Sequence, residues 1–358
     1  MQLLYDNIIF DLQKIGGISI YWKELIKHVM LDAEIELSFI QGKKHNQNFI
    51  YQTLVNNNPL INDIPNIRPF INNRYFPLIR LNKTSKVIFH SSYYRPFLDI
   101  NSKKVVTVHD FIYEHFEKGL KKNVHAFQKK MALSNADIII CISENTKRDL
   151  ISFYPKFKNK DIRVIYNGVS NNYFPIENLI HYEQFERPYL LVVGNRVGCK
   201  NFKNTIEAYR NYLVADYDLK IVGKPLTEEE NRLLMGCHDH IEIMNNVSEE
   251  KLNLLYNDAY ALIFPSTYEG FGIPIIEAMK AGCPVITTEE SCIKEVAGNG
   301  GVYMESLDAK GIIEAINRLN NKSYRNDIIA NGLRHSSQFS WDKTYINIKN
   351  IYSELTNA

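Results

Sequence analysis

The sequence has few cysteines and none at the spacing of a metal or redox site. Its five cysteines are odd in number, and no two form a C-x-x-C pair. A disulfide framework and a zinc site are therefore unsupported. We interpret Cys141 and Cys283, which lie in apolar stretches, as small core residues. Cys199 has no neighbour that favours a reactive thiol.

The sequence also has no long apolar run, and we expect no signal peptide. No eighteen apolar residues run together, so we expect no transmembrane helix. The first residues contain Asp6 and Asp11 and lack the basic start and apolar centre of a signal peptide. We therefore expect a cytoplasmic protein. A chain of 358 residues with 45% hydrophobic and 23% charged residues is typical of a globular protein with two domains.

Charge is distributed unevenly between the two halves of the chain. Residues 1–170 hold 24 Lys and Arg against 15 Asp and Glu, a net charge of +9, and the remainder carries −7. A basic first half is typical of proteins that meet an anionic partner or membrane surface. A solvated surface without any partner explains the same asymmetry equally well.

The most informative stretch lies between residues 259 and 284. An apolar run over 259–264 predicts a buried parallel strand. Gly270 and Gly272 then permit backbone conformations that side chains forbid. Pro274 suits the first turn of a helix, and Gly282 is typical of a helix end.

This strand, loop and helix predict an anion site. Free N–H groups at a helix start, reinforced by the helix dipole, bind phosphate. Glu269 and Glu277 flank that site, and their carboxylates are suited to accept hydrogen bonds from hydroxyl groups. A ligand with phosphates at its centre and hydroxyls at both ends is a nucleotide-sugar. In the alternative interpretation Glu269 caps the helix and Glu277 is solvated, which leaves the glycines and Pro274 unexplained.

The pattern E-G-F-G-I-P-x-x-E-A-M-x-x-G-x-P-V-I resembles the E-x7-E signature of retaining GT-B glycosyltransferases of family 4. The resemblance implies that Glu269 contacts the donor sugar and Glu277 contacts the nucleotide ribose. It also implies that the backbone between them binds the diphosphate, through Gly270, Phe271, Gly272 and Ile273.

Other positions match the same family. Gly16 and Gly17 match a glycine-bearing loop that approaches the donor diphosphate, and Lys200 matches a lysine that neutralises it. Arg196 stands two places after Gly194, where many members have their arginine one place after the glycine. His109 in V-T-V-H-D resembles the histidine beside the reacting sugar. His90, also at a strand end, remains open between a ligand contact and a structural role.

The implied fold is α/β, a GT-B arrangement of two Rossmann-like doubly wound domains that face each other across a cleft. We expect an acceptor-binding domain over 1–170 and a nucleotide-sugar-binding domain over 171–340. A C-terminal helix over 341–358 is expected to cross back to the first domain. Apolar runs predict strands at 3–10, 87–89, 104–108, 136–142, 189–193, 219–223, 241–244, 259–264 and 285–287.

Two stretches of the first half have no match to a motif. Residues 42–85 are rich in asparagine and are interpreted as a helix and loops over the acceptor side. Residues 117–133 carry five lysines interleaved with Leu120, Val124, Phe127 and Met131, which share one helix face. That helix could lie on an anionic membrane. We favour an ordinary surface helix with its apolar face in the core.

The predicted function is transfer of a sugar from a nucleotide-diphosphate donor to a hydroxyl of a glycan or lipid-linked glycan, with retention of configuration. GDP-mannose and surface polysaccharide synthesis are the first expectations. No metal is expected, because Arg196, Lys200 and a helix end can replace it. The alternatives are a nucleotide-sugar hydrolase or epimerase on the same fold and a non-catalytic carbohydrate-binding subunit. A dehydrogenase is disfavoured because no G-x-G-x-x-G follows the first strand, and nothing indicates nucleic-acid binding.

Overall fold

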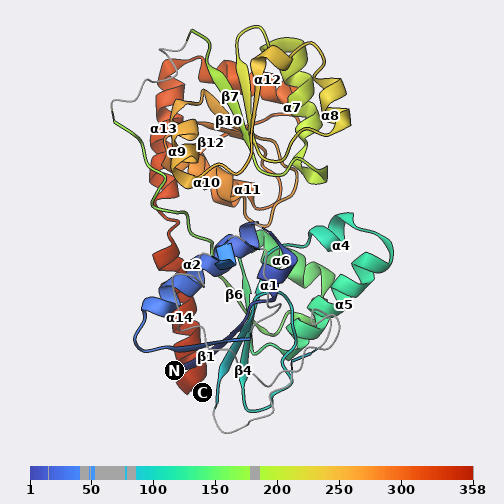
Figure 1. Ribbon diagram of the computed structural model, residues 1–358, viewed down its shortest axis with the longest axis vertical. Coiled ribbons are helices and arrows are strands. Elements are labelled where there is room, and N and C mark those ends of the chain that lie inside the picture. Colours follow the sequence, from blue (N-terminus) through green and yellow to red (C-terminus); the bar gives the residue numbers. More distant parts are fainter. Residues whose placement is uncertain are drawn as a thin grey trace. The chain divides into compact units, whose positions relative to one another are not determined.

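Parallel strands form the centre of each of the two units into which the chain folds (Figure 1). Unit 1 contains Met1–Gly168 and Trp341–Ala358, and unit 2 contains Val169–Ser340. The computed structural model describes residues 1–14, 16–40, 48, 50–52, 77–78, 86–177 and 186–357. Most of the stretch 42–85 therefore lies outside the described residues. Within the described ranges no helix is long and apolar enough to cross a membrane.

The sheet of unit 1 has the strand order β2-β1-β3-β4-β5-β6, with every pair parallel. Helices α2 and α14 lie on one side of this sheet and α5 and α6 on the other (Figure 1). The reversal of direction after β1 produces these two layers, because parallel crossovers are right-handed. The strands are β1 (Gln2–Asp6), β2 (Glu36–Ile40), β3 (Ile88–Ser91), β4 (Lys103–Val108), β5 (Ile138–Cys141) and β6 (Asp161–Val164). The helices are α1 (Ile8–Leu12), α2 (Gly17–Leu31), α4 (Ile112–Phe116), α5 (Gly119–Asn135), α6 (Glu144–Phe153) and α14 (Trp341–Asn357).

The sheet of unit 2 has the order β12-β11-β10-β7-β8-β9, a doubly wound arrangement. Helices α7, α8 and α12 cover one face and α9, α10 and α13 the other (Figure 1). The strands are β7 (Tyr189–Val193), β8 (Asp218–Val222), β9 (Ile241–Met244), β10 (Ala261–Phe264), β11 (Val285–Thr287) and β12 (Gly301–Tyr303). The helices are α7 (Phe202–Ala208), α8 (Glu228–Leu233), α9 (Glu249–Asp258), α10 (Ile273–Lys280), α11 (Ile293–Ala297), α12 (Ala309–Leu319) and α13 (Lys322–Ser336). The predicted α/β fold with two Rossmann-like domains is confirmed.

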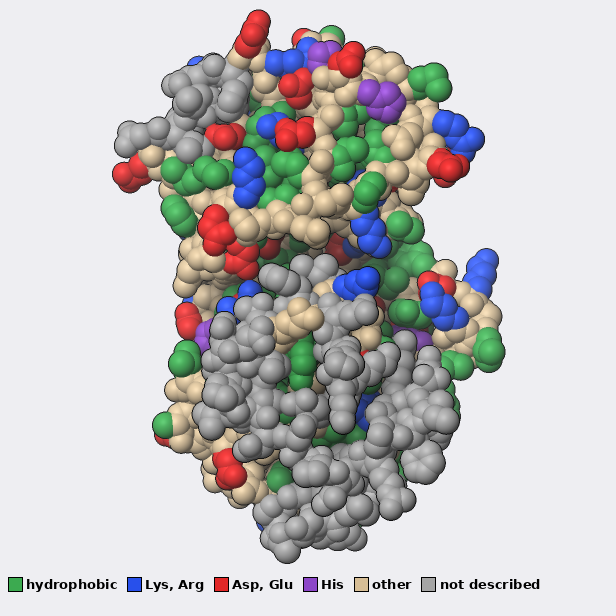
Figure 2. Space-filling view, viewed as in Figure 1, with side chains coloured by type: hydrophobic (Ala, Val, Ile, Leu, Met, Phe, Trp, Pro, Cys, Tyr) green, Lys and Arg blue, Asp and Glu red, His purple; other side chains and the backbone are tan. Residues whose placement is uncertain are grey.

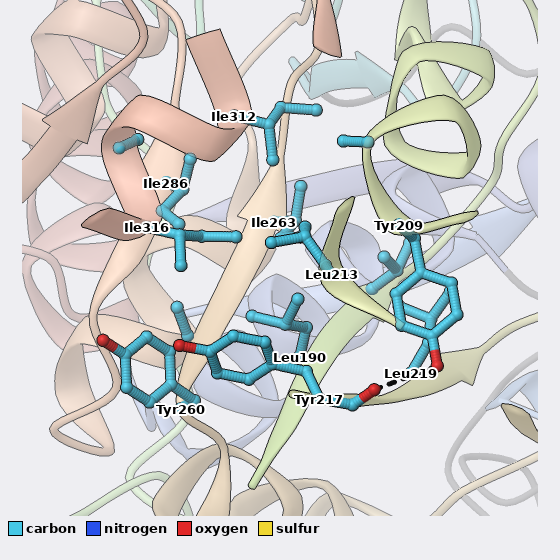
Figure 3. Close-up of a cluster of buried hydrophobic side chains, with 14 of the residues drawn as sticks. Leu190, Tyr209, Leu213, Tyr217, Leu219, Tyr260, Ile263, Ile286, Ile312 and Ile316 are labelled. Atoms are coloured by element: carbon cyan, nitrogen blue, oxygen red, sulfur yellow. Dashed lines mark hydrogen bonds between the residues drawn. The ribbon is translucent and has the colours of Figure 1, made fainter. Parts of the chain in front are cut away.

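A hydrophobic core of unit 2 is formed by side chains of the strands packed against α7 and α12. Leu190, Ile263 and Ile286 from three strands meet Ile312 and Ile316 of α12 (Figure 3). Tyrosines close the edge of this cluster, and the Tyr209 hydroxyl donates a hydrogen bond to the carbonyl of Tyr217 at 3.1 Å. The Tyr209 hydroxyl thus finds a backbone partner directly before β8, where the apolar core ends.

The predicted opening strand 3–10 is too long. The strand ends at Asp6, and Ile8–Leu12 form the short helix α1. Ile8, Ile9 and Phe10 are all buried, so this apolar run has no exposed side to reveal a helical period. Ser143 caps α6 as predicted, because its hydroxyl accepts a hydrogen bond from the Thr146 N–H at 3.0 Å.

Helix α5 turns a different face inward from the one predicted. Its buried side chains include His125, Lys129 and Leu133. Leu120 and Phe127 of the predicted apolar face are 79% and 66% exposed. The preference for an ordinary surface helix with that apolar face in the core is therefore wrong. The buried Lys129 ammonium explains the difference, because Glu114 pairs with it at 2.9 Å and allows its burial.

His90 belongs to a buried hydrogen-bond network that joins α14 to the sheet of unit 1. Its Nδ1 lies 2.6 Å from the Tyr352 hydroxyl, and its Nε2 lies 2.8 Å from Thr107 Oγ1. The network continues to Tyr5, 2.9 Å from the Tyr352 hydroxyl, and to Tyr21, 3.3 Å from Thr107. Burial lowers the pKa of His90 to about 3, so the ring is neutral. Both ring nitrogens are occupied, which assigns His90 the structural role.

We expect Tyr352→Phe to weaken unit 1, because it removes the hydrogen-bond partner of the Tyr5 hydroxyl and of His90 Nδ1 in the interior. Such a loss costs about 1–3 kcal/mol. Urea unfolding followed by tryptophan fluorescence isolates unit 1, since both tryptophans, Trp22 and Trp341, belong to it. Tyr345→Phe is the matched control, because its hydroxyl bonds Asp32, which also pairs with a lysine. Equal losses in the two variants would contradict the structural role of the network.

Candidate functional site in unit 2

The predicted anion site lies where β10 ends and α10 begins. Gly272, the residue before the helix, has φ of +92°, in the left-handed region that favours glycine. A Cβ atom added there would lie 3.1 Å from Ile275 Cδ1. Pro274 occupies the first turn, and Gly282 follows the helix with φ of +80°. The sequence therefore forms the predicted loop and helix for local steric reasons.

Two loops that are far apart in the sequence meet at this point. The Thr267 N–H donates to the Cys199 carbonyl at 2.7 Å, which joins the loop after β10 to the loop after β7. Beside this bond, Lys200 Nζ lies 2.6 Å from Glu269 Oε2. Glu269 is 8% exposed, and its Oε1 is buried without a hydrogen-bond partner among the described residues. One carboxylate oxygen is thus neutralised and the other is left as a free acceptor.

The backbone of Glu269 is held from a third loop. The Glu269 N–H donates a hydrogen bond to Ser291 Oγ at 3.3 Å. The Ser291 hydroxyl in turn donates to the Glu269 carbonyl at 2.9 Å. Cys292 Sγ donates to the same carbonyl at 3.1 Å. These bonds fix the direction of the Glu269 side chain, as a preorganised site requires.

Arg196 also lies at this edge, but its charge is already balanced. Its Nε and Nη2 lie 3.0 and 3.1 Å from the two carboxylate oxygens of Glu230. The guanidinium stands over the Phe202 ring at 5.2 Å, and the side chain is 4% exposed. Nη1 alone of its nitrogens is buried without a partner in the described part of the chain. Arg196 and Lys200 line one small crevice with Ser266.

Glu277 lies inside α10 and receives hydrogen bonds from tyrosines. The Tyr256 hydroxyl donates to its Oε2 at 3.0 Å, and Tyr173 is a second hydroxyl partner. Burial raises the pKa of Glu277 from 4.5 to about 7, although both tyrosines act to lower it. The carboxyl group therefore changes its charge close to neutral pH.

The other predicted site residues lie in unit 1. An added Cβ at Gly17, the first residue of α2, would meet nothing within 4 Å, and Gly16 has an extended backbone. His109 follows β4 and is 4% exposed, with Nε2 unpartnered within the described ranges. Its ring packs edge-on against Tyr21 of α2 at 5.0 Å. Burial, followed by the charge of Lys129, lowers the pKa of His109 to about 3.

The structure thus groups the predicted residues in two sets. Lys200, Arg196, Glu269 and the glycine loop gather at one edge of unit 2, with Glu277 in the helix that follows. The Gly16–Gly17 turn and His109 share an edge of unit 1. The partners that position Glu269 and Glu277 were missed, namely Tyr173, Tyr256, Ser291 and Cys292, and so was Glu230, which pairs with Arg196. None of them lies at a sequence spacing that signals contact.

Two family models match the chain in tandem. Residues 15–172 match the model described as Glycosyltransferase Family 4, and residues 180–335 match the model described as Glycosyl transferases group 1. Together the two matched ranges include all the predicted site residues of both units.

Individual proteins give the same picture. An uncharacterized glycosyltransferase of Methanocaldococcus jannaschii is 26% identical over all of this chain and 99% of its own length. The O-antigen chain mannosyltransferase B of Escherichia coli is 27% identical over 71% of each chain. The sucrose-phosphate synthase structure from Thermosynechococcus elongatus has a TM-score of 0.74 and 17% identity, covering 100% of this chain and 99% of that one. This last likeness concerns the fold.

We expect Glu277→Gln to stabilise the protein at alkaline pH. The folded protein holds the Glu277 proton more tightly than the unfolded chain, so stability falls as the pH rises from 4.5 to about 7 and stays reduced above it. Glutamine keeps an acceptor for Tyr256 and removes this cost. The Tm of the variant should exceed that of the wild type at about pH 8.5 and match it near pH 5, with a gain on the order of 1–3 kcal/mol. A gain that is the same at both pH values would refute the assignment.

Proposed function

We propose that the chain is a glycosyltransferase that transfers a sugar from a nucleotide-diphosphate donor to a glycan hydroxyl with retention of configuration, and the two matching glycosyltransferase models and the GT-B fold support this proposal. The first candidate for the donor is GDP-mannose. The first candidate for the acceptor is a lipid-linked glycan in surface polysaccharide synthesis. The similarity to an O-antigen mannosyltransferase supports both.

The observation that carries the proposal is the state of the Glu269 carboxylate. Lys200 neutralises Oε2, while the buried Oε1 has no donor in the described part of the structure. An unsatisfied buried acceptor costs about 1–3 kcal/mol, which a hydroxyl of the donor sugar would relieve. Glu269 therefore orients the sugar, and Glu277 accepts hydrogen bonds from the ribose.

The chemical step breaks the bond between the anomeric carbon and the diphosphate, and the electron pair leaves with the diphosphate oxygen. The acceptor oxygen forms the new bond to the anomeric carbon. Retention places the acceptor hydroxyl on the face from which the diphosphate departs, so the departing oxygen is the nearest base for the acceptor proton. The Lys200 ammonium and the backbone of Gly270, Phe271, Gly272 and Ile273 stabilise the growing negative charge. We propose that these groups take the place of a metal ion.

Unit 1 contributes a close backbone approach and a neutral histidine. The open space at Gly17 lets a phosphate group come near the start of α2, beside Gly16. His109 has an unpartnered Nε2 within the described residues, and burial keeps the ring uncharged, so it is suited to hydrogen-bond a sugar hydroxyl. Arg196 pairs with Glu230 and Lys200 pairs with Glu269, so each of these cations is held in place by a carboxylate.

We also propose that α5 contacts the cytoplasmic face of an anionic membrane. Leu120 and Phe127 are exposed on this helix, and Lys121 and Lys130 are exposed beside them. Hydrophobic and basic side chains lie together at the edge of unit 1 formed by α4 and α5 (Figure 2). Apolar side chains that enter the lipid boundary, with lysines near anionic headgroups, are typical of interfacial helices.

A panel of nucleotide-sugars tests the donor site by thermal shift. We expect one donor to raise the Tm of the wild type by mass action. Lys200→Met should lose most of that response, because its ammonium neutralises the diphosphate, and Lys203→Met, an exposed lysine nearby, should keep it. Proton NMR of the product should show the anomeric configuration of the donor. An inverted product would refute retention, and release of free sugar with every acceptor would favour a hydrolase.

Co-sedimentation with vesicles tests the α5 surface. The wild type should bind vesicles containing roughly one-third phosphatidylglycerol and release them at high salt, since exposed charges are screened. Leu120→Ser with Phe127→Ser should abolish binding without loss of folding, because both side chains are exposed. Leu31→Ser, an 87% exposed leucine on α2, is the matched control. Equal binding by the two variants would exclude α5 as the contact.

A further inference from the structure

Two buried polar side chains in unit 1, Asn7 and Arg95, have atoms without a hydrogen-bond partner among the described residues and take no part in the mechanism above. Asn7 directly follows β1 and is 2% exposed, and neither atom of its side-chain amide has a hydrogen-bond partner among the described residues. Arg95 lies in the loop after β3 and is 5% exposed, with Nε unpartnered in the same ranges. Strands β1 and β3 are paired neighbours, with Tyr5 opposite His90. The two unsatisfied groups therefore occur at adjacent strand ends, where strands lie about 4.8 Å apart.

The carboxylate that could neutralise Arg95 is engaged elsewhere. Asp6 accepts hydrogen bonds from the Ser92 N–H at 2.7 Å, the Ser92 hydroxyl at 2.6 Å and the Ser91 hydroxyl at 3.2 Å. These bonds hold the turn that carries Arg95, and the Arg95 N–H itself donates to Ser91 Oγ at 2.9 Å. No ion pair joins Arg95 to a carboxylate in the described part of the chain. Its backbone is thus fixed, while Nε of its guanidinium has no hydrogen-bond partner within the described ranges and Asp6 and Asp11 act on the group through their charges.

Groups of this kind are costly and are therefore rare unless a ligand satisfies them. Buried amides are almost always hydrogen-bonded, and an uncompensated buried charge is strongly destabilising. Burial lowers the pKa of Arg95, while Asp6 and Asp11 act in the opposite direction without pairing with it. The cost is incurred at the carboxyl edge of a parallel sheet, which is the edge where such sheets bind ligands.

The chemistry of the two side chains defines the ligand. A guanidinium presents a planar fork of N–H donors that matches two oxygens of a phosphate or carboxylate. The Asn7 amide adds a donor for the same anion and an acceptor for a neighbouring hydroxyl. We propose that Asn7 and Arg95 form a subsite for an anionic group, a phosphate or a carboxylate, carried by the sugar acceptor. This proposal rests on the proposed function for its acceptor and on unit 1 alone for its geometry.

The subsite makes the enzyme selective for a charged acceptor. His109 follows β4, the strand next to β3, so the anion site and the predicted sugar-contacting histidine lie on neighbouring strand ends. An acceptor that binds through its anion would present its hydroxyl group along this edge. Phosphorylated and acidic sugars satisfy this description, and neutral sugars do not.

Calorimetric titration of inorganic phosphate and of glucuronate distinguishes the two sources of negative charge. The full chain is titrated with saturating GDP present, so that the diphosphate site proposed for unit 2 is filled. We expect at least one anion to bind the wild type and Arg95→Gln to weaken it tenfold or more. Arg148→Gln, an exposed arginine on α6, should bind as the wild type does. The anion that responds identifies the group on the acceptor.

Stability without ligand provides the second measurement. Because Arg95 Nε is buried without a hydrogen-bond partner in the described residues, Arg95→Gln should raise the Tm of the free protein, and phosphate or glucuronate should no longer raise it further. A structural arginine would give a lower Tm. The proposal is overturned if Arg95→Gln lowers the Tm, if it binds both anions like the wild type, or if neither anion binds the wild type. If GDP itself fails to bind, the proposed donor is wrong. The same phosphate and glucuronate titrations are then repeated without GDP, and they decide the role of Arg95.

Discussion

The parallel direction of every strand is the constraint on which both sites depend. A parallel sheet sends all its carboxyl ends to one edge, so loops far apart in the sequence emerge side by side. In unit 2 this brings Lys200, after β7, within 2.6 Å of Glu269, after β10. In unit 1 it aligns Asn7, Arg95 and His109 on the ends of β1, β3 and β4. The chemistry of the chain is therefore a property of sheet edges.

Five of the six described strands of unit 2 could be predicted because their apolar runs are short and clearly bounded, whereas β12 was not predicted. The predicted ranges 189–193, 241–244 and 285–287 coincide with β7, β9 and β11. The predicted length of the opening strand was wrong because Ile8, Ile9 and Phe10 are all buried. An apolar run without an exposed face is compatible with a strand and with a helix. The predicted buried face of α5 was wrong for a different reason. The sequence pattern is amphipathic, but Glu114 pairs with the buried Lys129, and the apolar side chains Leu120 and Phe127 face the solvent.

The chemical groups of the candidate site were easier to predict than their supports. Glu269, Gly272 and Pro274 are close in sequence, and each has a local reason for its place. Tyr256 reaches Glu277 from another helix, and Ser291 reaches Glu269 from another loop. These contacts depend on how elements pack, which no short spacing encodes. Arg196 illustrates the same limit, since its pairing with Glu230 depends on the position of α8, which the sequence pattern does not predict.

Helix α14 has a consequence for synthesis of the protein. Ile348, Ile351 and Tyr352 belong to the core of unit 1, yet all of unit 2 is translated before them. All of unit 2 therefore emerges from the ribosome before α14, which unit 1 needs to complete its core. Until then His90 and Tyr5 lack their hydrogen bonds to the Tyr352 hydroxyl. The usual order, in which N-terminal domains finish folding first, is reversed. The part of the chain that is made first is completed last.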